Sequence, residues 1–155
     1  MMMKKFIYLM APIVVFCLSL SFVSCATSKS STTLSKGASL SDYKYIVLGN
    51  ANEGDADMAD VLRMVQNELS GKLKALSREE AQPLIEQGVK VLSPTINVKS
   101  EKWDDGQTFI TINFHDYVTH QLVAVVKSGG ATPLNPIGQN PSFMGIKKEL
   151  KKAFK

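Results

Sequence analysis

Three consecutive segments with the residue patterns of β-strands constrain the fold of this chain most strongly. Apolar residues recur in steps of two or four in the first segment, 89–103, and in steps of two in the second, 107–116. The third segment, 121–127, is mostly apolar. A period of two predicts strands with one buried face. Polar turn residues at 104–106 and 117–120 separate the segments, so the sequence predicts an antiparallel meander.

Amphipathic helices are predicted on both sides of this meander. Residues 56–76 carry apolar side chains at spacings of three and four, with acids near the start and bases near the end, as the helix dipole favours. A second such stripe covers 143–154. A short helix is predicted between Ser77, which opens a capping-box sequence, and Gly88. The β-branched and aromatic stretch 43–50 predicts the first strand.

The predicted element order is β-α-(α)-β-β-β-α, in a single domain that spans residues 43–155. Half-buried strands and amphipathic helices cover each other's apolar faces. The predicted fold class is therefore α+β: a two-layer domain with about four strands in a mixed sheet and with the helices on one face. The Gly- and Pro-rich stretch 128–142 predicts a long irregular loop, either mobile or functional.

The N-terminus has the layout of a secretory signal. Lys4 and Lys5 precede an apolar run that extends to Val23. We therefore predict a signal peptide over residues 1–24. Residues 25–42 are rich in Ser and Thr and poor in large apolar side chains, which predicts a flexible tether. A retained membrane anchor is the alternative, because the run is about long enough to span a bilayer.

The end of the signal, Phe22-Val23-Ser24-Cys25, resembles the lipobox of bacterial lipoproteins. In that family the signal is cut before the cysteine, whose thiol and new amine are acylated, and two or more acyl chains anchor a protein stably. The resemblance implies that acylated Cys25 holds the chain in a lipid bilayer. In that family an Asp directly after the cysteine favours the inner membrane. This chain has Ala26 at that position, so the resemblance implies the outer membrane. No acids follow to mark surface export, so the resemblance implies its periplasmic side.

The element order is also similar to that of small envelope lipoproteins, which include the outer-membrane activators of penicillin-binding proteins and the curli-secretion lipoproteins. The hairpin 112–126 carries Asp116 and Thr119 as those proteins do, with His120 where they have a Gly. The resemblance implies a binding or accessory module for another envelope component. That partner would be an envelope protein or peptidoglycan.

His115, Asp116 and His120 are the side chains closest to a catalytic or metal-binding pattern. A metal-assisted hydrolase would use them as ligands or as a general base. The competing interpretation is structural, since Asp caps turns and His tolerates unusual backbone angles. The sequence contains no phosphate-binding loop, nucleophile elbow or zinc-ligand spacing, so we predict a non-enzyme without metal or cofactor. A structural subunit of a lipoprotein assembly is a further alternative.

Two groups of residues are predicted to bind partners. Tyr43, Tyr45 and Trp103 are expected on the sheet face opposite the helices, either exposed or covered by the tether or the long loop. The net charge of +4 is a local feature, because five lysines lie in the last nine residues, and this argues against a nucleic-acid partner. The last helix is expected to present a lysine face that is solvated, or that contacts anionic lipid, an acidic partner or peptidoglycan. Its residues are Lys147, Lys148, Lys151 and Lys152.

Overall fold

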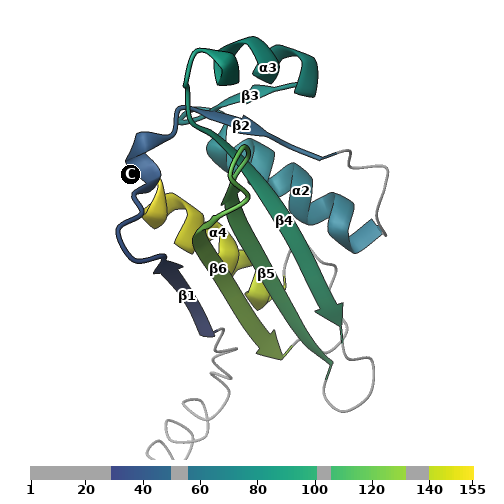
Figure 1. The fold of residues 1–155 in the computed structure, drawn as a ribbon. Coiled ribbons are helices and arrows are strands. Elements are labelled where there is room, and N and C mark those ends of the chain that lie inside the picture. Colours follow the sequence, from purple (N-terminus) through teal and green to yellow (C-terminus); the bar gives the residue numbers. More distant parts are fainter. Residues whose placement is uncertain (1–28, 50–55, 101–105, 132–139) are drawn as a thin grey trace, which may run out of the picture.

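The structure is a computed structural model that describes residues 29–49, 56–100, 106–131 and 140–155 (Figure 1). The predicted signal peptide, the acylation of Cys25 and the binding role of Trp103 lie outside the described residues. The strands are β1 (Lys29–Leu34), β2 (Tyr45–Val47), β3 (Lys74–Leu76), β4 (Val91–Ser100), β5 (Gln107–Asp116) and β6 (Leu122–Ala131). The helices are α2 (Ala56–Leu69), α3 (Arg78–Glu86), α4 (Pro141–Ala153) and a 3₁₀ turn, Leu40–Asp42.

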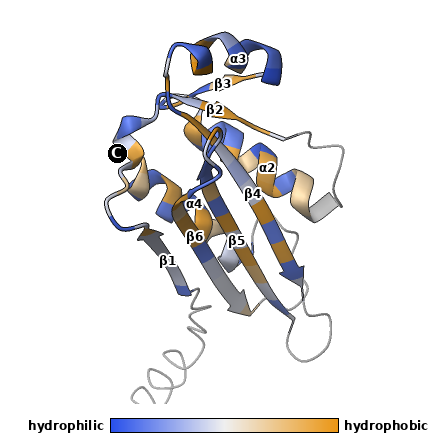
Figure 2. Cartoon of the chain, viewed as in Figure 1, coloured by the Kyte–Doolittle hydropathy of each residue, from blue (hydrophilic) through white to orange (hydrophobic). Residues whose placement is uncertain are grey.

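The predicted antiparallel meander is confirmed. Strands β4, β5 and β6 pair in succession, and Ile112 lies opposite both Ile96 and Val126. Hydrophobic and hydrophilic residues alternate along these strands in Figure 2. Strand β2 then joins β4 in parallel, as a crossover through a helix requires. The result is a mixed sheet with the order β1-β6-β5-β4-β2-β3.

Helices α2 and α4 cover one face of this sheet, side by side (Figure 1). The apolar stripes predicted for them supply the core: Val65, Ile146 and Leu150 are fully buried. At the end of α4, Phe154 packs edge-on against Phe114 of β5, with ring centroids 5.3 Å apart. None of the helices described here is long and apolar enough to cross a membrane.

A glycine allows α4 to lie close to the sheet. A Cβ atom on Gly145 would meet the Ser128 hydroxyl of β6, and it would lie 3.2 Å from the Cβ atoms of Ser128 and Ser30. Glu149, one turn further on, is buried and accepts hydrogen bonds from the hydroxyls of Ser30, at 3.3 Å, and Thr32, at 2.9 Å. Strand β1 is therefore fixed to α4 by polar contacts as well as to β6 by backbone pairing.

The α+β class agrees with the prediction, but the sheet has six strands rather than about four. One additional strand, β3, lies inside the stretch predicted to be helical to Leu76. Helix α2 ends at Leu69 instead, shortly before Gly71, and the chain then pairs with β2. Leu73 and Leu76 continue the helical spacing by coincidence, and both are buried after the helix has ended.

The other additional strand, β1, lies inside the predicted tether. Residues 29–34 pair antiparallel with β6, and the 3₁₀ turn follows, so residues 29–42 belong to the folded domain that was predicted to start at residue 43. Composition misled the prediction because β1 needs no large apolar side chains. Ser30 and Thr32 face Glu149, and Ser31 between them is exposed.

The second predicted helix is confirmed, including its capping box. The Ser77 hydroxyl accepts from the Glu80 amide, and the Glu80 carboxylate accepts from the Ser77 amide. This helix, α3, does not share a face with α2 and α4, which corrects the expectation of helices on one face. It packs on the other side of β2, over a small cluster that contains Val47, Leu76, Ala81 and Val91.

Candidate functional site

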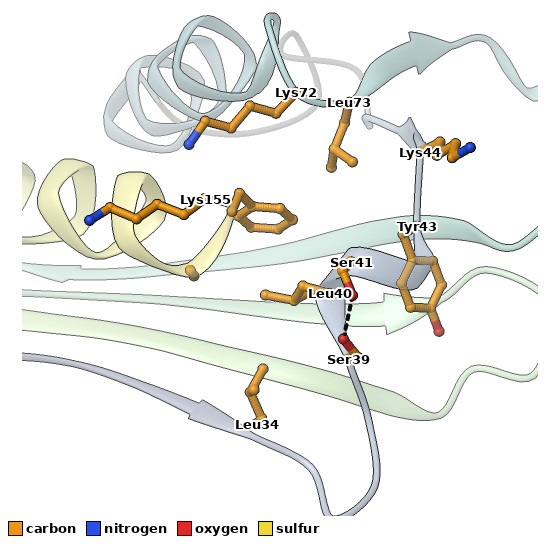
Figure 3. A pocket seen from close by; sticks show the side chains of 11 residues that line it. Leu34, Ser39, Leu40, Ser41, Tyr43, Lys44, Lys72, Leu73 and Lys155 are labelled. Carbon is orange, nitrogen blue, oxygen red and sulfur yellow. Dashed lines mark hydrogen bonds between the residues drawn. The ribbon is translucent and has the colours of Figure 1, made fainter.

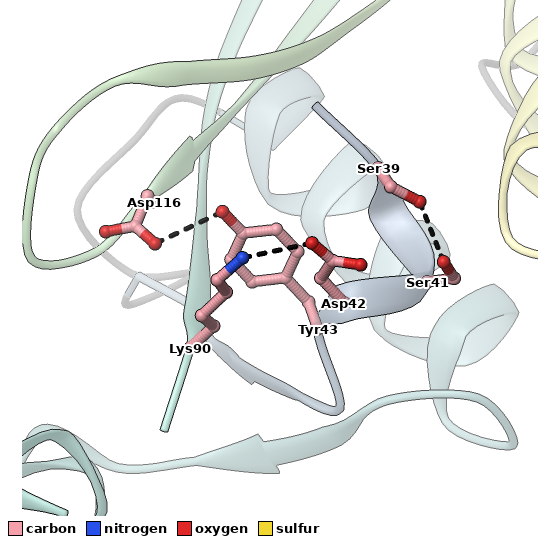
Figure 4. Close-up of polar contacts among 6 residues, drawn as sticks. All are labelled: Ser39, Ser41, Asp42, Tyr43, Lys90 and Asp116. Carbon is pink, nitrogen blue, oxygen red and sulfur yellow. Dashed lines mark hydrogen bonds and ion pairs between the residues drawn. The ribbon is translucent and has the colours of Figure 1, made fainter. Parts of the chain in front are cut away.

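The hairpin between β5 and β6 is built around Asp116. Its Oδ1 atom accepts hydrogen bonds from the amides of Val118 and Thr119 and from the Thr119 hydroxyl, at 2.9–3.1 Å. Its Oδ2 atom accepts from the Tyr43 hydroxyl at 3.1 Å (Figure 4). Both carboxylate oxygens thus have partners within the fold, as expected for a turn-capping aspartate.

These contacts shift the pKa values of both partners. Burial alone would raise the pKa of Asp116, but the hydrogen bonds from Thr119, Tyr43 and Val118 outweigh it and hold that pKa below its usual range. Burial, together with the charge of Asp116, raises the pKa of Tyr43 to about 12. Lys90 lies 5.8 Å from the centroid of the Tyr43 ring and forms an ion pair with Asp42 at 3.0 Å.

The two histidines occupy different places. His120 ends the turn with a φ of 56°, which is a left-handed backbone conformation. A Gly would also fit there, because Gly adopts positive φ without steric cost. His115 lies in β5, half-buried, where it is paired with Ser93 and Leu122. In the part of the chain that the structure describes, no three His, Cys, Asp or Glu side chains form a group that could hold a metal.

The two described tyrosines of the predicted aromatic patch do not come together. Tyr43 is buried and packs with the main core between the sheet and helices α2 and α4. Tyr45 is half-buried against the cluster under α3, on the other side of β2. Each side chain therefore contributes to a different part of the core.

The lysines of α4 do not form one common face. Lys147 and Lys151 both reach Glu68 of α2, at 3.0 and 3.7 Å, and the Glu68 side chain is only 11% exposed. They therefore tie the two helices together. Lys148 and Lys152 are exposed. Among the four lysines of the predicted surface, Lys148 and Lys152 are the two that do not take part in the ion pairs with Glu68.

An open pocket of about 460 Å³ lies where β1, the 3₁₀ turn and the end of α4 meet. Figure 3 shows Leu34, Leu40 and Leu73 pointing into the same space from three separate segments. Leu34 is half exposed. Lys72 and Lys155 contribute cations, and the Lys72 ammonium also donates to the carbonyl of Lys151 at 3.3 Å. We call this site the distal pocket, because Leu34, the last residue of β1, lines it.

The face of the sheet opposite α2 and α4 is uncovered by any described helix along β1, β6, β5 and β4. The strand register identifies the side chains of this face, which alternate along each strand with those that face α2 and α4. They are Lys29, Ser31, Thr33, Thr95, Asn97, Lys99, Phe109, Thr111, Asn113, His115, Val125 and Lys127. We call this surface the open face; among its described residues it carries three lysines and no acid.

A groove of about 590 Å³ lies on the open face beside the start of β1. Phe109 is 41% exposed, and its ring lies against Gly129 so closely that a Cβ atom on this glycine would be 2.6 Å from it. Lys29 and Lys127, from neighbouring strands, also line the groove. We call it the proximal groove, because it lies next to the end of β1 to which the N-terminal segment is joined.

Comparison with known proteins shows a likeness in fold only. The sequence matches no protein-family profile and no curated protein. PelC from Paraburkholderia phytofirmans, solved as a dodecamer, has a similar structure, with a TM-score of 0.51 and 13% identity over 83% of this chain and 98% of that one. A single-substitution variant of the same dodecamer gives the same TM-score and identity and is covered over 99% of its length.

Of the residues predicted to bind a partner, Tyr43 lines the distal pocket, but the sequence does not predict the other residues of the two concave sites. Leu34, Leu40 and Lys29 were assigned to the tether, and Phe109 was expected only as part of a strand. Residues 29–34 show no alternation of apolar and polar side chains in the sequence, and an alternation of partly buried and exposed residues appears only in the folded structure.

Proposed function

We propose that this chain is a lipid-anchored accessory module of a bacterial cell envelope, which binds another envelope protein through the distal pocket. Acylated Cys25 would hold it in the outer membrane on the periplasmic side. The observation that carries the proposal is the distal pocket itself, with its apolar floor and lysines at its edge. A segment that offers an apolar side chain next to carboxylates complements such a pocket.

The direction of β1 supports this use of the pocket. Cys25 precedes the start of β1, and the strand then runs toward Leu34 at the pocket. A chain anchored at Cys25 therefore has the bilayer near one end of β1 and the pocket at the other. The pocket is accessible to a periplasmic partner in this orientation, and the half-exposed Leu34 gains buried area when a partner binds.

The anchor is tested by replacing Cys25. Cys25→Ser should abolish incorporation of labelled fatty acid and release the protein from the membrane fraction or leave it unprocessed. Cys17→Ser is the matched control, since it changes the other cysteine and should leave both properties intact. Continued fatty-acid labelling of the Cys25→Ser variant would refute the assignment.

The pocket is tested by photocrosslinking in intact cells. A photoreactive phenylalanine at Leu34 should give a crosslink to one envelope protein, identified by mass spectrometry. Met144, at the opposite end of α4, is similarly exposed, at 57% against 50%, and serves as the control position. The same products from both positions would mean that the pocket is not the binding site.

A structural subunit of a homo-oligomer is the second candidate function. It is favoured by the fold likeness to PelC, which was solved as a dodecamer. Strand β1 is at the edge of the described sheet, and an unpaired edge is a surface onto which another chain can add. Native mass spectrometry of the detergent-solubilised protein tests this: a single closed oligomer is expected, and a monomer alone would exclude the role.

A further inference from the structure

We propose that the proximal groove is a membrane-docking surface, in which Lys29 and Lys127 contact anionic lipid headgroups and Phe109 lies at the level of the interface. The inference rests on the anchor assigned above for its geometry, and it deepens that function by naming the face of the domain that is turned toward the bilayer.

The distance from the anchor to the groove is limited by covalent geometry. Four residue steps separate Cys25 from Lys29, and a fully extended chain covers at most about 14 Å over that length. Lys29 itself lines the groove. Because Lys29 already belongs to β1, acylation of Cys25 keeps the groove close to the headgroup region whatever path residues 26–28 take.

The residue types in the groove suit that position. Surfaces that lie in the membrane interface combine Lys or Arg with apolar side chains such as Phe, and a lysine can lay its apolar stem along the surface while its ammonium stays hydrated. Phe109 is exposed even though it is large and apolar, and its ring is held against Gly129. Gln107 and Thr111 add groups that can bond to phosphate or glycerol oxygens.

The charge of the open face supports an anionic surface as its partner. The described residues of this face include Lys29, Lys99 and Lys127 and no carboxylate. By contrast, Lys147 and Lys151 of α4 are already paired with Glu68. Each lysine near an anionic membrane strengthens binding by roughly fivefold, and this gain is lost at high salt.

The charge contribution is measured on the full mature chain with Cys25→Ser, so that no acyl chain takes part. Sedimentation with vesicles of phosphatidylcholine, with or without phosphatidylglycerol, gives the partition coefficient. Lys29→Gln with Lys127→Gln should weaken binding to the anionic vesicles about 25-fold. Lys148→Gln with Lys152→Gln removes the same charge from exposed positions on α4 and should have little effect. Circular dichroism checks that all variants are folded.

Three outcomes would overturn the docking surface: no binding of this chain to anionic vesicles at low salt, equal binding to neutral and anionic vesicles, or equal losses in the two double variants. Binding to a soluble acidic glycan or protein with no binding to vesicles would assign the groove to a different partner. None of these outcomes depends on acylation, so they are distinguishable from a failure of the proposed anchor.

The orientation is measured on the acylated chain in anionic vesicles. Once Cys25 is acylated, the mature sequence has no other thiol, so single labels can be introduced at Thr111→Cys in the groove and at Val118→Cys in the hairpin between β5 and β6. A spin label at 111 should be shielded from a water-soluble relaxing agent, and the label at 118 should remain accessible. Equal accessibility would refute docking, and labelling of the unmutated chain would instead reveal that Cys25 is not acylated.

Discussion

The hydroxyl of Tyr43 donates a hydrogen bond to Oδ2 of Asp116 across 3.1 Å, although 73 positions separate the two residues in the sequence. This contact joins the segment after the 3₁₀ turn to the hairpin between β5 and β6. Since Asp116 also caps that hairpin, one carboxylate holds two distant parts of the chain. Asp116 is therefore a structural residue. The contribution of its hydrogen bond with Tyr43 to the stability of the fold should depend on pH.

Tyr43→Phe should lower the free energy of unfolding by about 1.5 kcal/mol near neutral pH, because it removes a hydrogen bond to a charged group. The folded-state pKa of Tyr43 is about 12, against 10.0 for the free side chain. Its contribution is therefore fully present below pH 10 and is lost as pH rises from 10 toward 12. Urea unfolding across this range should show the variant losing less stability than the wild type. Tyr45→Phe keeps the bond and should follow the wild type; parallel curves for Tyr43→Phe would contradict the assignment.

Gly145→Ala should destabilise the protein by about 1 kcal/mol, the net of steric crowding of about 1–3 kcal/mol and a helix-propensity gain of up to about 1 kcal/mol. Thermal unfolding measures the change. The added methyl meets Ser128, whose hydroxyl is buried without a hydrogen-bond partner in the described structure, so Ser128→Ala should partly restore stability in the double variant. Gly71→Ala is the control, since nothing lies within 4 Å of its added Cβ. A Gly145→Ala protein as stable as the wild type would show that α4 can shift freely.

Glu68→Gln should lower the free energy of unfolding by about 1 kcal/mol, because it leaves Lys147 and Lys151 close together without the carboxylate between them. The loss should shrink at high salt. Lys148→Gln with Lys152→Gln should change stability by no more than about 0.5 kcal/mol, as is usual for exposed surface positions. Chemical unfolding at low and high salt compares the two. Equal effects would mean that all four lysines are simply solvated.

Removing residues 25–42 should unfold or strongly destabilise the domain, whereas removing residues 25–28 should not. The longer deletion takes away β1, and with it both hydroxyls that donate to the buried Glu149 carboxylate. It also removes the buried side chain of Leu40 from the core, which is worth about 1.5–3 kcal/mol of the about 5–15 kcal/mol that stabilises a domain. Cooperative unfolding measured by circular dichroism distinguishes the two proteins. A stable domain starting at residue 43 would restore the tether interpretation for 29–42.

Local patterns were sufficient for much of the fold. The alternation in β5 predicts its buried face because the period of a strand is a property of a few consecutive residues. The capping box at Ser77 involves residues three positions apart and appears in the structure as predicted. The class, the meander and the three helices follow from signals of this range. The lipobox at Cys25 is also a local pattern, and it gives the cellular location that we propose.

Contacts between distant segments decided the rest. Strand β1 exists because β6 offers an edge and Glu149 offers a carboxylate, and neither can be inferred from the polar sequence 29–34. Strand β3 interrupts a helical pattern because the chain leaves the helix after Leu69 and pairs with β2, a contact that no local spacing reports. The two concave sites arise in the same way, since the residues that line them come from separate elements. A local pattern reports which face of a segment is apolar, but only packing determines which segments meet and what they leave exposed.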